Sequence, residues 1–285
     1  MSLPDSFSFS LYHGEKIIML TKLIIIILDG CRPDGLAAAR TPHIDALWGS
    51  GAYSWHGQTV MPSVTLPAHM SMFRSVSPER HGVGADNVFN PAASAFPSLF
   101  DIAQADGLHT AFFYSWEQLR DLAAPGSLTT SAMWKGIKGR DNDTRIAAAA
   151  ADFLEQEQPD LLVLYLGDVD FAGHLHGWMS PGYIATIEQN DAAVGIVITA
   201  LESNRLREDY TILLLSDHGG HDFGHGTDAP EDMTIIWMAN GASIRSNYML
   251  EFPPNIMDTA PTAAMLLGIE PSPLWEGRAL TEILA

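Results

Sequence analysis

Residues 216–226 carry side chains of the types that bind metal ions. The segment reads SDHGGHDFGHG, so three histidines and two aspartates fall within nine residues. Imidazole and carboxylate groups at this density are typical of a site for zinc or a similar divalent cation. The adjacent Asp217 and His218 can bind one ion, and the glycine-rich bend can return His225 toward a neighbouring ion. We therefore expect all three residues to be metal ligands.

Two other segments offer ligands of the same kind. Asp170 and His174 are four residues apart, so one helical turn can bring both side chains to the same metal, with Gly173 allowing a close approach. Asp29 directly follows the apolar run Leu23–Leu28. An aspartate after a strand is often only a loop or cap residue, so Asp29 becomes a strong candidate only in combination with the others.

Thr65 is the candidate nucleophile. It lies in the segment PSVTLPAH (residues 62–69), next to an apolar run with a helical pattern. Free N–H groups and the positive dipole end at the start of such a helix favour a phosphate group. A threonine hydroxyl is a poor nucleophile at neutral pH unless a bound divalent cation lowers its pKa. Taken alone, Thr65 is equally well explained as a helix cap.

The elements that must position these residues follow from the hydrophobic pattern. Short apolar runs predict buried strands at Leu23–Leu28, Thr110–Tyr114, Leu161–Leu166, Thr211–Leu215 and Thr234–Met238. Helical patterns lie at Thr41–Gly51, Ser98–Gly107, Asp143–Gln156, Pro181–Ser203 and Asn255–Leu267. Strands that alternate with helices indicate an α/β fold with a doubly wound, mostly parallel sheet and helices on both faces.

Three of the predicted strands run directly into candidate ligands. Asp29 follows the first strand, Asp170 lies just beyond the third, and Asp217 lies just beyond the fourth. In open α/β sheets, ligands bind beyond the carboxyl ends of the strands. Carboxylates and imidazoles gathered at one edge of a sheet cost stability unless cations are present. The pattern therefore predicts a metal site at this edge.

Five motifs in this order resemble the alkaline phosphatase superfamily, and most closely its nucleotide pyrophosphatase/phosphodiesterase branch. They read IIIILDG, TPHIDALWGSG, MPSVTLPAHMSMFRSVSPERHGV, LGDVDFAGHLHG and LSDHGGHDFGHG. The resemblance implies an alkaline phosphatase-like fold and two zinc ions. It also implies hydrolysis of phosphodiester or pyrophosphate bonds in a small phosphate ester such as a nucleotide, through a covalent phospho-threonine intermediate.

The resemblance also assigns the site residues. One metal is expected on Asp170, His174 and His225, and the other on Asp29, Asp217 and His218, with Thr65 bound on that second side. In this branch an asparagine after the His-Gly motif binds a phosphoryl oxygen. Asp86 stands at that position here, and Asn87 follows it. Either the loop is shifted by one residue, so that Asn87 makes the catalytic contact, or Asp86 alters the substrate contact.

Other functions remain open on the same residues. A phosphomonoesterase or a phosphonate hydrolase would use the same metals, and a non-catalytic homologue would keep the ligands alone. A phosphomutase would require a large inserted domain, for which 285 residues leave little room. A sulfatase of the same superfamily would carry a Cys- or Ser-x-Pro-x-Arg motif, whereas the nucleophile segment here reads VTLP.

Composition restricts the partners. A formal net charge of −19 disfavours nucleic acid, because there is no basic stripe to neutralise its backbone. The apolar stretch 17–28 is too short to span a membrane, and no signal-peptide pattern follows it, so we expect a cytoplasmic protein without a membrane partner. We expect residues 1–20 to be a poorly ordered leader and residues 21–285 to be a single catalytic domain with a small lid at 124–140. The oligomeric state is left open.

Overall fold

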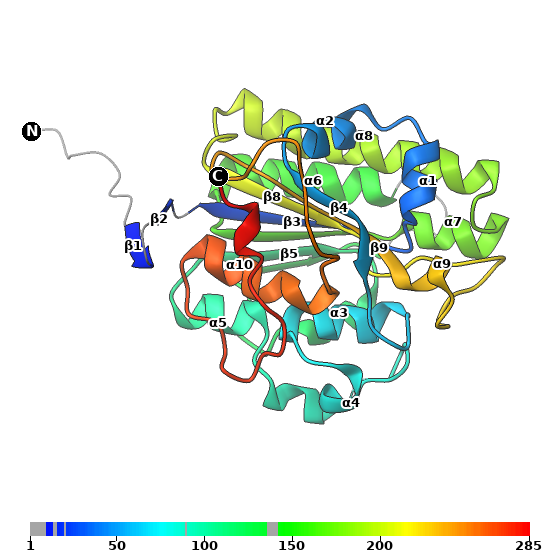
Figure 1. Cartoon of the computed structure of the whole chain (residues 1–285), viewed down its shortest axis with the longest axis horizontal. Coiled ribbons are helices and arrows are strands. Elements are labelled where there is room, and N and C mark those ends of the chain that lie inside the picture. Colours follow the sequence, from blue (N-terminus) through cyan, green and yellow to red (C-terminus); the bar gives the residue numbers. More distant parts are fainter. Residues whose placement is uncertain (1–9, 14–15, 20, 89, 136–141) are drawn as a thin grey trace, which may run out of the picture.

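A computed structural model describes residues 10–13, 16–19, 21–88, 90–135 and 142–285. Its centre is an eight-stranded sheet in the order β10-β4-β9-β8-β3-β7-β5-β6 (Figure 1). The strands are β3 (Lys22–Leu28), β4 (Ala52–Gln58), β5 (Thr110–Tyr114), β6 (Thr130–Met133), β7 (Leu161–Leu166), β8 (Tyr210–Leu215), β9 (Thr234–Asn240) and β10 (Tyr248–Met249). Among these strands β9 alone runs against the others. The expected mostly parallel α/β sheet is therefore confirmed.

Strand β3 lies in the middle of the sheet, between β7 and β8. Its residues from Leu23 to Leu28 are all fully buried, and they alternate between two hydrophobic cores. Leu23, Ile25 and Ile27 face one core, and the residues between them face the other. A strand that is covered on both faces needs this continuous apolar sequence, because successive side chains point to opposite sides.

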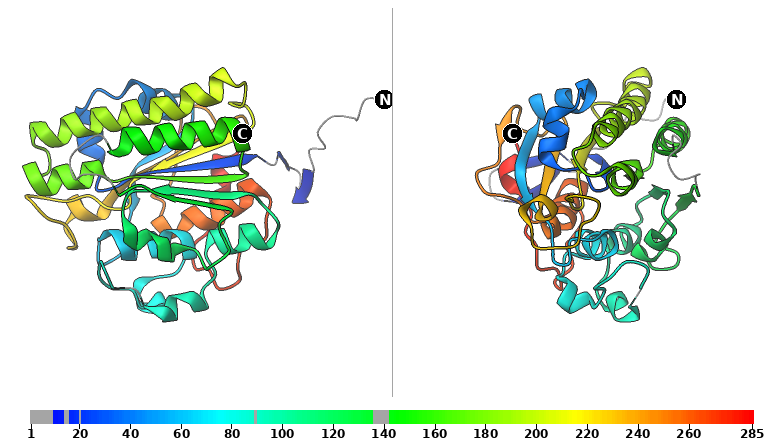
Figure 2. Two further views of the ribbon diagram at one scale, coloured as in Figure 1. Left: turned by 180° about the vertical axis from the view of Figure 1, so that it is seen from behind. Right: turned by 90° about the vertical axis from the view of Figure 1, so that its right-hand side faces the viewer.

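Helices cover both faces of the sheet (Figures 1 and 2). One layer contains α1 (Pro33–Ala38), α2 (Pro42–Gly49), α6 (Asn142–Glu157), α7 (Asp168–His176) and α8 (Pro181–Ser203). The other contains α3 (Thr65–Arg74), α5 (Leu99–Ala105) and α10 (Thr259–Leu267). The short helices are α4 (Pro78–His81), α9 (Pro230–Met233), η1 (Pro91–Ala95), η2 (Glu117–Leu122), η3 (Ile256–Asp258) and η4 (Thr281–Ile283).

All the strands and helices expected from the hydrophobic pattern are present, with small differences at their ends. The pattern did not predict β4. This strand reads AYSWHGQ and contains polar residues and a glycine, so it lacks the apolar run of a buried strand. It pairs antiparallel with β9, and the register shifts between Ser54 and Gly57.

The expected leader and lid lie partly outside the described residues. Within residues 1–20 the structure describes β1 (Ser10–His13) and β2 (Lys16–Met19), which pair antiparallel in a separate two-stranded sheet. Within residues 124–140 it describes 124–135, and this part contains β6, the edge strand beside β5. Residues 1–9, 14, 15, 20 and 136–141 are outside the description.

Helix α8 is, by length and composition alone, the one described helix that could cross a membrane. Half of its most apolar window is buried inside the molecule. The helix also carries a buried carboxylate, Asp191, which accepts backbone N–H groups of His43 at 3.0 Å and Ile44 at 2.8 Å. These contacts join α8 to α2. A buried carboxylate that binds a neighbouring helix is a feature of a helix that packs within a folded domain.

The topology brings three chain segments to one edge of the sheet. Strands β8, β3 and β7 are adjacent and parallel, and Leu28 is in register with Leu166 while Ile27 is in register with Leu215. The residues that follow these strands therefore leave the sheet side by side, which is the usual place for a ligand site.

Removing the Asp191 carboxylate should weaken the contact between α2 and α8. We expect Asp191→Ala to lower the free energy of unfolding by about 2 to 3 kcal/mol, because two buried N–H groups lose a charged acceptor. Urea denaturation followed by circular dichroism measures this. Asp191→Asn is the matched control and should lose less, since it keeps one acceptor oxygen. Equal losses in the two variants would contradict the role given to the carboxylate.

Candidate metal centre

The expected metal ligands meet beyond the carboxyl ends of β3, β8 and β7. Asp29 follows β3, Asp217 and His218 follow β8, and Asp170 lies in the first turn of α7. Two groups of ligand atoms each lie within 4.8 Å of one another, namely Asp29, Asp217 and His218, and Asp170, His218 and His225. The two groups share His218, so the structure offers two neighbouring cation positions.

The Thr65 hydroxyl lies beside the first group of ligands. His218 Nε2 lies 3.2 Å from Asp29 Oδ1 and 3.4 Å from Asp217 Oδ2. The hydroxyl oxygen of Thr65 lies 3.1 Å from the same nitrogen and 3.5 Å from Asp29 Oδ1. The Thr65 oxygen therefore lies among the atoms that would surround a cation at this position.

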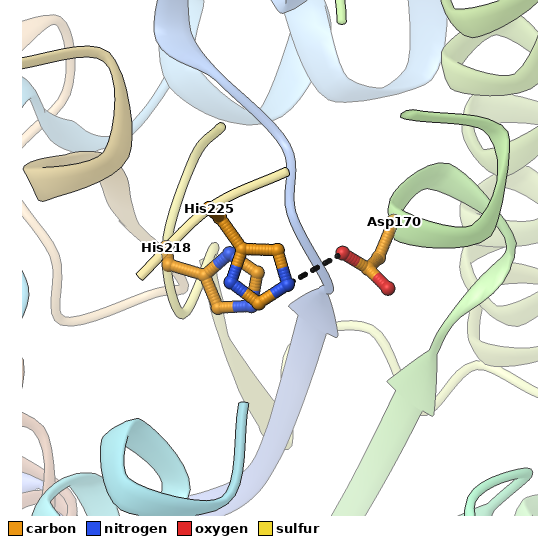
Figure 3. Close-up of side chains that lie close together, drawn as sticks. All are labelled: Asp170, His218 and His225. Carbon is orange, nitrogen blue, oxygen red and sulfur yellow. Dashed lines mark ion pairs between the residues drawn. The ribbon is translucent and has the colours of Figure 1, made fainter. Parts of the chain in front are cut away.

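In the second group, two histidines approach the same carboxylate oxygen. His225 Nε2 and His174 Nε2 each lie 3.5 Å from Asp170 Oδ1 (Figure 3 shows the first of these). The rings of His225 and His218 are stacked, with centroids 4.0 Å apart. The sequence predicts His174 as the third ligand beside Asp170 and His225. The structure places His174 next to Asp170 but groups His218 with the other two.

Backbone carbonyl groups set the protonation of the three histidines. A carbonyl oxygen only accepts hydrogen bonds, so each Nδ1 that contacts one must carry a proton, and Nε2 keeps its lone pair for a metal. The Nδ1–oxygen distances are 2.7 Å for His218 and Gly219, 3.0 Å for His225 and Ser63, and 2.9 Å for His174 and Phe223. All three imidazoles are therefore prepared as neutral ligands.

Two buried carboxylate oxygens in the centre lack hydrogen-bond partners among the described residues. These atoms are Asp170 Oδ1 and Asp217 Oδ2. The other carboxylate oxygen of Asp217, Oδ1, accepts hydrogen bonds from the N–H groups of Gly30 at 3.1 Å and His218 at 2.9 Å. A buried oxygen without a partner is costly. Such atoms beside three imidazole nitrogens fit a pair of divalent cations.

In the protein without metal, the pKa shifts of the ligands also indicate an excess of negative charge at the centre. Burial, together with the charge of Asp29, raises the pKa of both Asp170 and Asp217 well above the usual value. Burial opposes the charged form of His218, but Asp217 and Asp29 outweigh it and raise the pKa of the imidazole. Burial also acts to raise the pKa of Asp29, yet His218, His69 and Tyr165 hold it at about 2. The carboxylates thus repel one another and attract positive charge.

Helix α3 begins at Thr65, and its first turn faces the centre. Asp86 accepts the backbone N–H of Leu66 through Oδ1 at 2.8 Å. Asn87 is exposed, with a positive φ of 59°, and its side-chain oxygen accepts from the amide of Gln118. Asp86 and Asn87 both line a cleft of about 430 Å³. Of these two residues, Asp86 reaches the start of α3, while the phosphoryl contact expected of Asn87 stays a prediction.

Tyr165 supports Asp29 and was not found from the sequence. Its hydroxyl donates a hydrogen bond to Asp29 Oδ2, and its buried ring lies next to His69. His69 donates from Nδ1 to the Thr65 carbonyl at 2.8 Å. Nothing in the run LLVLYL distinguishes Tyr165 from a core residue.

Trp178 contacts each ligand-bearing segment and was also missed. Its indole N–H donates to the carbonyl of Gly30 at 3.0 Å, next to Asp29. A Cβ atom on Gly173 would lie 2.5 Å from its ring and one on Gly220 2.3 Å away, so the two glycines let the ring lie against the backbone beside His174 and His218. The ring centroid lies 5.0 Å from that of His174 and 5.8 Å from that of His225.

Comparison with known proteins points to one family. A family model described as type I phosphodiesterase/nucleotide pyrophosphatase matches residues 23–229. An uncharacterised pyrophosphatase/phosphodiesterase of Schizosaccharomyces pombe is 26% identical over 252 residues, which are 81% of this chain and 50% of the relative. Ectonucleotide pyrophosphatase/phosphodiesterase family member 5 of Homo sapiens is 25% identical over 238 residues, 76% of this chain and 48% of the relative. The chain thus spans half or less of these relatives.

Solved structures share the fold. Murine ectonucleotide pyrophosphatase/phosphodiesterase 5, solved as an inactive variant in complex with AMP, superposes with a TM-score of 0.79. The superposition covers 93% of this chain and 100% of the murine chain, at 16% sequence identity. The human counterpart has the same TM-score at 18% identity and also covers 93% of this chain. At these identities the likeness establishes the architecture.

Zinc should stabilise the protein through the two groups of ligands. Zinc at about one hundred times its dissociation constant contributes about 2.7 kcal/mol per site, which raises the Tm of a domain of this size by roughly 5 to 10 °C. Differential scanning fluorimetry with and without a chelator measures this shift. Asp217→Asn should reduce it, whereas Asp222→Asn, in the same loop but outside both groups, should not. An undiminished shift in Asp217→Asn would remove Asp217 from the ligand set.

Trp178→Phe should weaken zinc binding. The variant loses the hydrogen bond to Gly30 and part of the surface that holds the two histidine rings, and such outer partners are worth about tenfold or more in affinity. Competition with a chromophoric zinc chelator gives the dissociation constant. The matched control is Trp275→Phe, which removes an indole N–H bonded to the Pro97 carbonyl at 2.8 Å. Unchanged affinity in Trp178→Phe would show that Trp178 does not position the ligands.

Proposed function

Because the chain belongs to the type I phosphodiesterase/nucleotide pyrophosphatase family, we propose that it hydrolyses phosphodiester or pyrophosphate bonds with Thr65 as the nucleophile. The observation that carries the proposal is the position of the Thr65 hydroxyl oxygen, 3.1 Å from His218 Nε2 and 3.5 Å from Asp29 Oδ1 at the start of α3. The membership agrees with the resemblance seen in the sequence.

Zinc is the proposed metal, with one ion on Asp29, Asp217 and His218 and a second on Asp170 and His225 with His174 or His218. Two carboxylates with one imidazole, and one carboxylate with two imidazoles, are donor sets that suit zinc, and the proton on each Nδ1 directs Nε2 toward the ions. When bound, the two ions would lower the pKa of the Thr65 hydroxyl and neutralise charge on the phosphoryl group.

The residues of the chain would bring nucleophile and substrate together. Thr65 is buried with 4% of its surface exposed, and Asp29, whose Oδ1 lies 3.5 Å from the Thr65 oxygen, lines the cleft. The Thr65 oxygen forms a bond to phosphorus while the bond to the leaving group breaks, which yields phospho-threonine. Water then hydrolyses this ester and restores the hydroxyl. Most of the rate gain would come from positioning and from electrostatic stabilisation.

The substrate is proposed to be a small phosphate ester such as a nucleotide. The cleft has a volume of about 430 Å³, and Trp116, Phe171 and Asn142 line it together with residues of the metal centre. This volume lies within the range of pockets for drug-sized ligands. A murine relative of the same fold was solved with AMP, which supports a nucleotide. A phosphomonoesterase or phosphonate hydrolase would use the same centre and is the second candidate.

Thr65→Ala should abolish turnover but keep the metals. We expect the rate on a bis(nitrophenyl) phosphate to fall about a thousandfold or more, since the covalent step loses its nucleophile. Zinc stoichiometry, measured by inductively coupled plasma mass spectrometry, should stay as in the wild type. Thr59→Ala is the control, because it removes a nearby buried hydroxyl that has no hydrogen-bond partner among the described residues.

The same assay tests the class of the enzyme. Wild-type activity on the diester should disappear with chelator and return with zinc. Full activity of the Thr65→Ala protein would refute the assigned nucleophile. Absence of zinc-dependent hydrolysis of any phosphate ester would refute the proposed function as a whole.

A further inference from the structure

We propose that Asp86 selects substrates by charge: it favours a reacting phosphorus that carries one negative charge, as in a diester or an internal pyrophosphate, over a terminal phosphate that carries two. The inference rests on the proposed function and names the class of ester that this site accepts. Two observations support this inference: the position of the Asp86 carboxylate relative to Thr65, and the residues that line the cleft.

Asp86 occupies a position that suits a phosphoryl oxygen. Its Oδ1 accepts the N–H of Leu66 at 2.8 Å, and Leu66 directly follows Thr65. The first N–H groups of a helix have no partner within the helix and commonly bind anions. A phosphorus atom attacked by Thr65 must bring its oxygens close to this N–H group. The Asp86 carboxylate is therefore a fixed negative charge at the N–H group that those oxygens approach.

The Asp86 carboxylate also faces the metal centre. Asp86 is half-buried and lines the same cleft as Asp29, Asp170 and His225. Burial and the charge of Asp29 raise its pKa, and its own charge contributes to the raised pKa of Asp170. These carboxylates act on one another across the cleft, so a substrate placed between them is exposed to the field of Asp86 as well.

No lysine or arginine is among the described residues that line this cleft. Two described arginines that line other hollows are paired with carboxylates. Arg32 binds Asp34 at 2.6 Å, and Arg120 binds Glu117 at 2.6 Å beside a separate hollow. A second negative charge on the substrate would therefore meet Asp86 without a fixed cationic side chain of the described chain to offset it.

The size of the effect follows from Coulomb's law. One additional unit charge a few ångströms from a carboxylate, at the effective dielectric constant of a protein surface, changes binding by at least about tenfold. The additional charge of a terminal phosphate gains more from the cations of the centre, and repulsion by Asp86 opposes that gain. Asp86 thus acts as a specificity-determining residue.

The test compares nitrophenyl phosphate with its methyl ester, which share a leaving group and differ in charge by one unit. We expect Asp86→Asn and Asp86→Ala, assayed as full chains with zinc, to raise the monoester-to-diester ratio of kcat/KM by about tenfold or more. Two variants are needed because asparagine can donate a new hydrogen bond, whereas alanine removes the charge and the acceptor of the Leu66 N–H without adding a donor. Asp222→Asn, which removes one exposed carboxylate from the glycine-rich loop, should leave the ratio unchanged.

Three outcomes would overturn the inference. The first is an unchanged ratio in both Asp86 variants. The second is a rise in Asp86→Asn alone, which would assign the effect to the new amide donor. The third is an equal loss on both esters with weaker zinc binding, which would make Asp86 a support of the centre. In each case Thr65-dependent hydrolysis of the diester by the wild type would still stand, so failure here is distinct from failure of the proposed function.

Discussion

Repulsion among three carboxylates at one edge of the sheet is the constraint on which the site depends. Asp29, Asp170 and Asp217 converge because β3, β7 and β8 are adjacent and parallel, and each of these residues lies at or just beyond the end of its strand. Withdrawn from water, their charges are unfavourable unless positive charge lies between them. In the protein alone, His218 supplies part of that charge, which explains its raised pKa. Divalent cations would supply the remainder, and the oxygens without partners mark where they would bind.

The surrounding structure holds the ligands in place before any metal binds. The backbone carbonyls hold Nδ1 of the three histidines, which leaves Nε2 of each ring to face the centre. Tyr165 holds Asp29, and Trp178 fills the space between the segments that carry the ligands. Ligands oriented by packing lose little entropy on binding, which is how a rigid fold raises the affinity of a metal site.

The start of α3 combines two opposing demands. The helix presents its free N–H groups and positive dipole end beside Thr65, which suits an incoming phosphoryl group. Asp86 takes up one of those N–H groups and adds a negative charge at the same place. The cations would attract the substrate, while Asp86 limits how much charge it brings. The metal ligands thus provide attraction for the substrate, and the neighbouring Asp86 provides selection by charge.

The sequence alone determined the five apolar strands, the layers and most of the candidate ligands. A sheet buried on both faces requires continuous apolar runs, and local spacings such as Asp170 to His174 are visible without a structure. Tertiary structure alone decided that His218 belongs to both groups of ligands and that Tyr165 and Trp178 support the centre. Those two contacts join residues 136 and 148 positions apart, and β4 is a strand because β9 and β10 pair with it. Local patterns encode periodicity and propensity, whereas contacts between distant segments depend on how the whole chain packs.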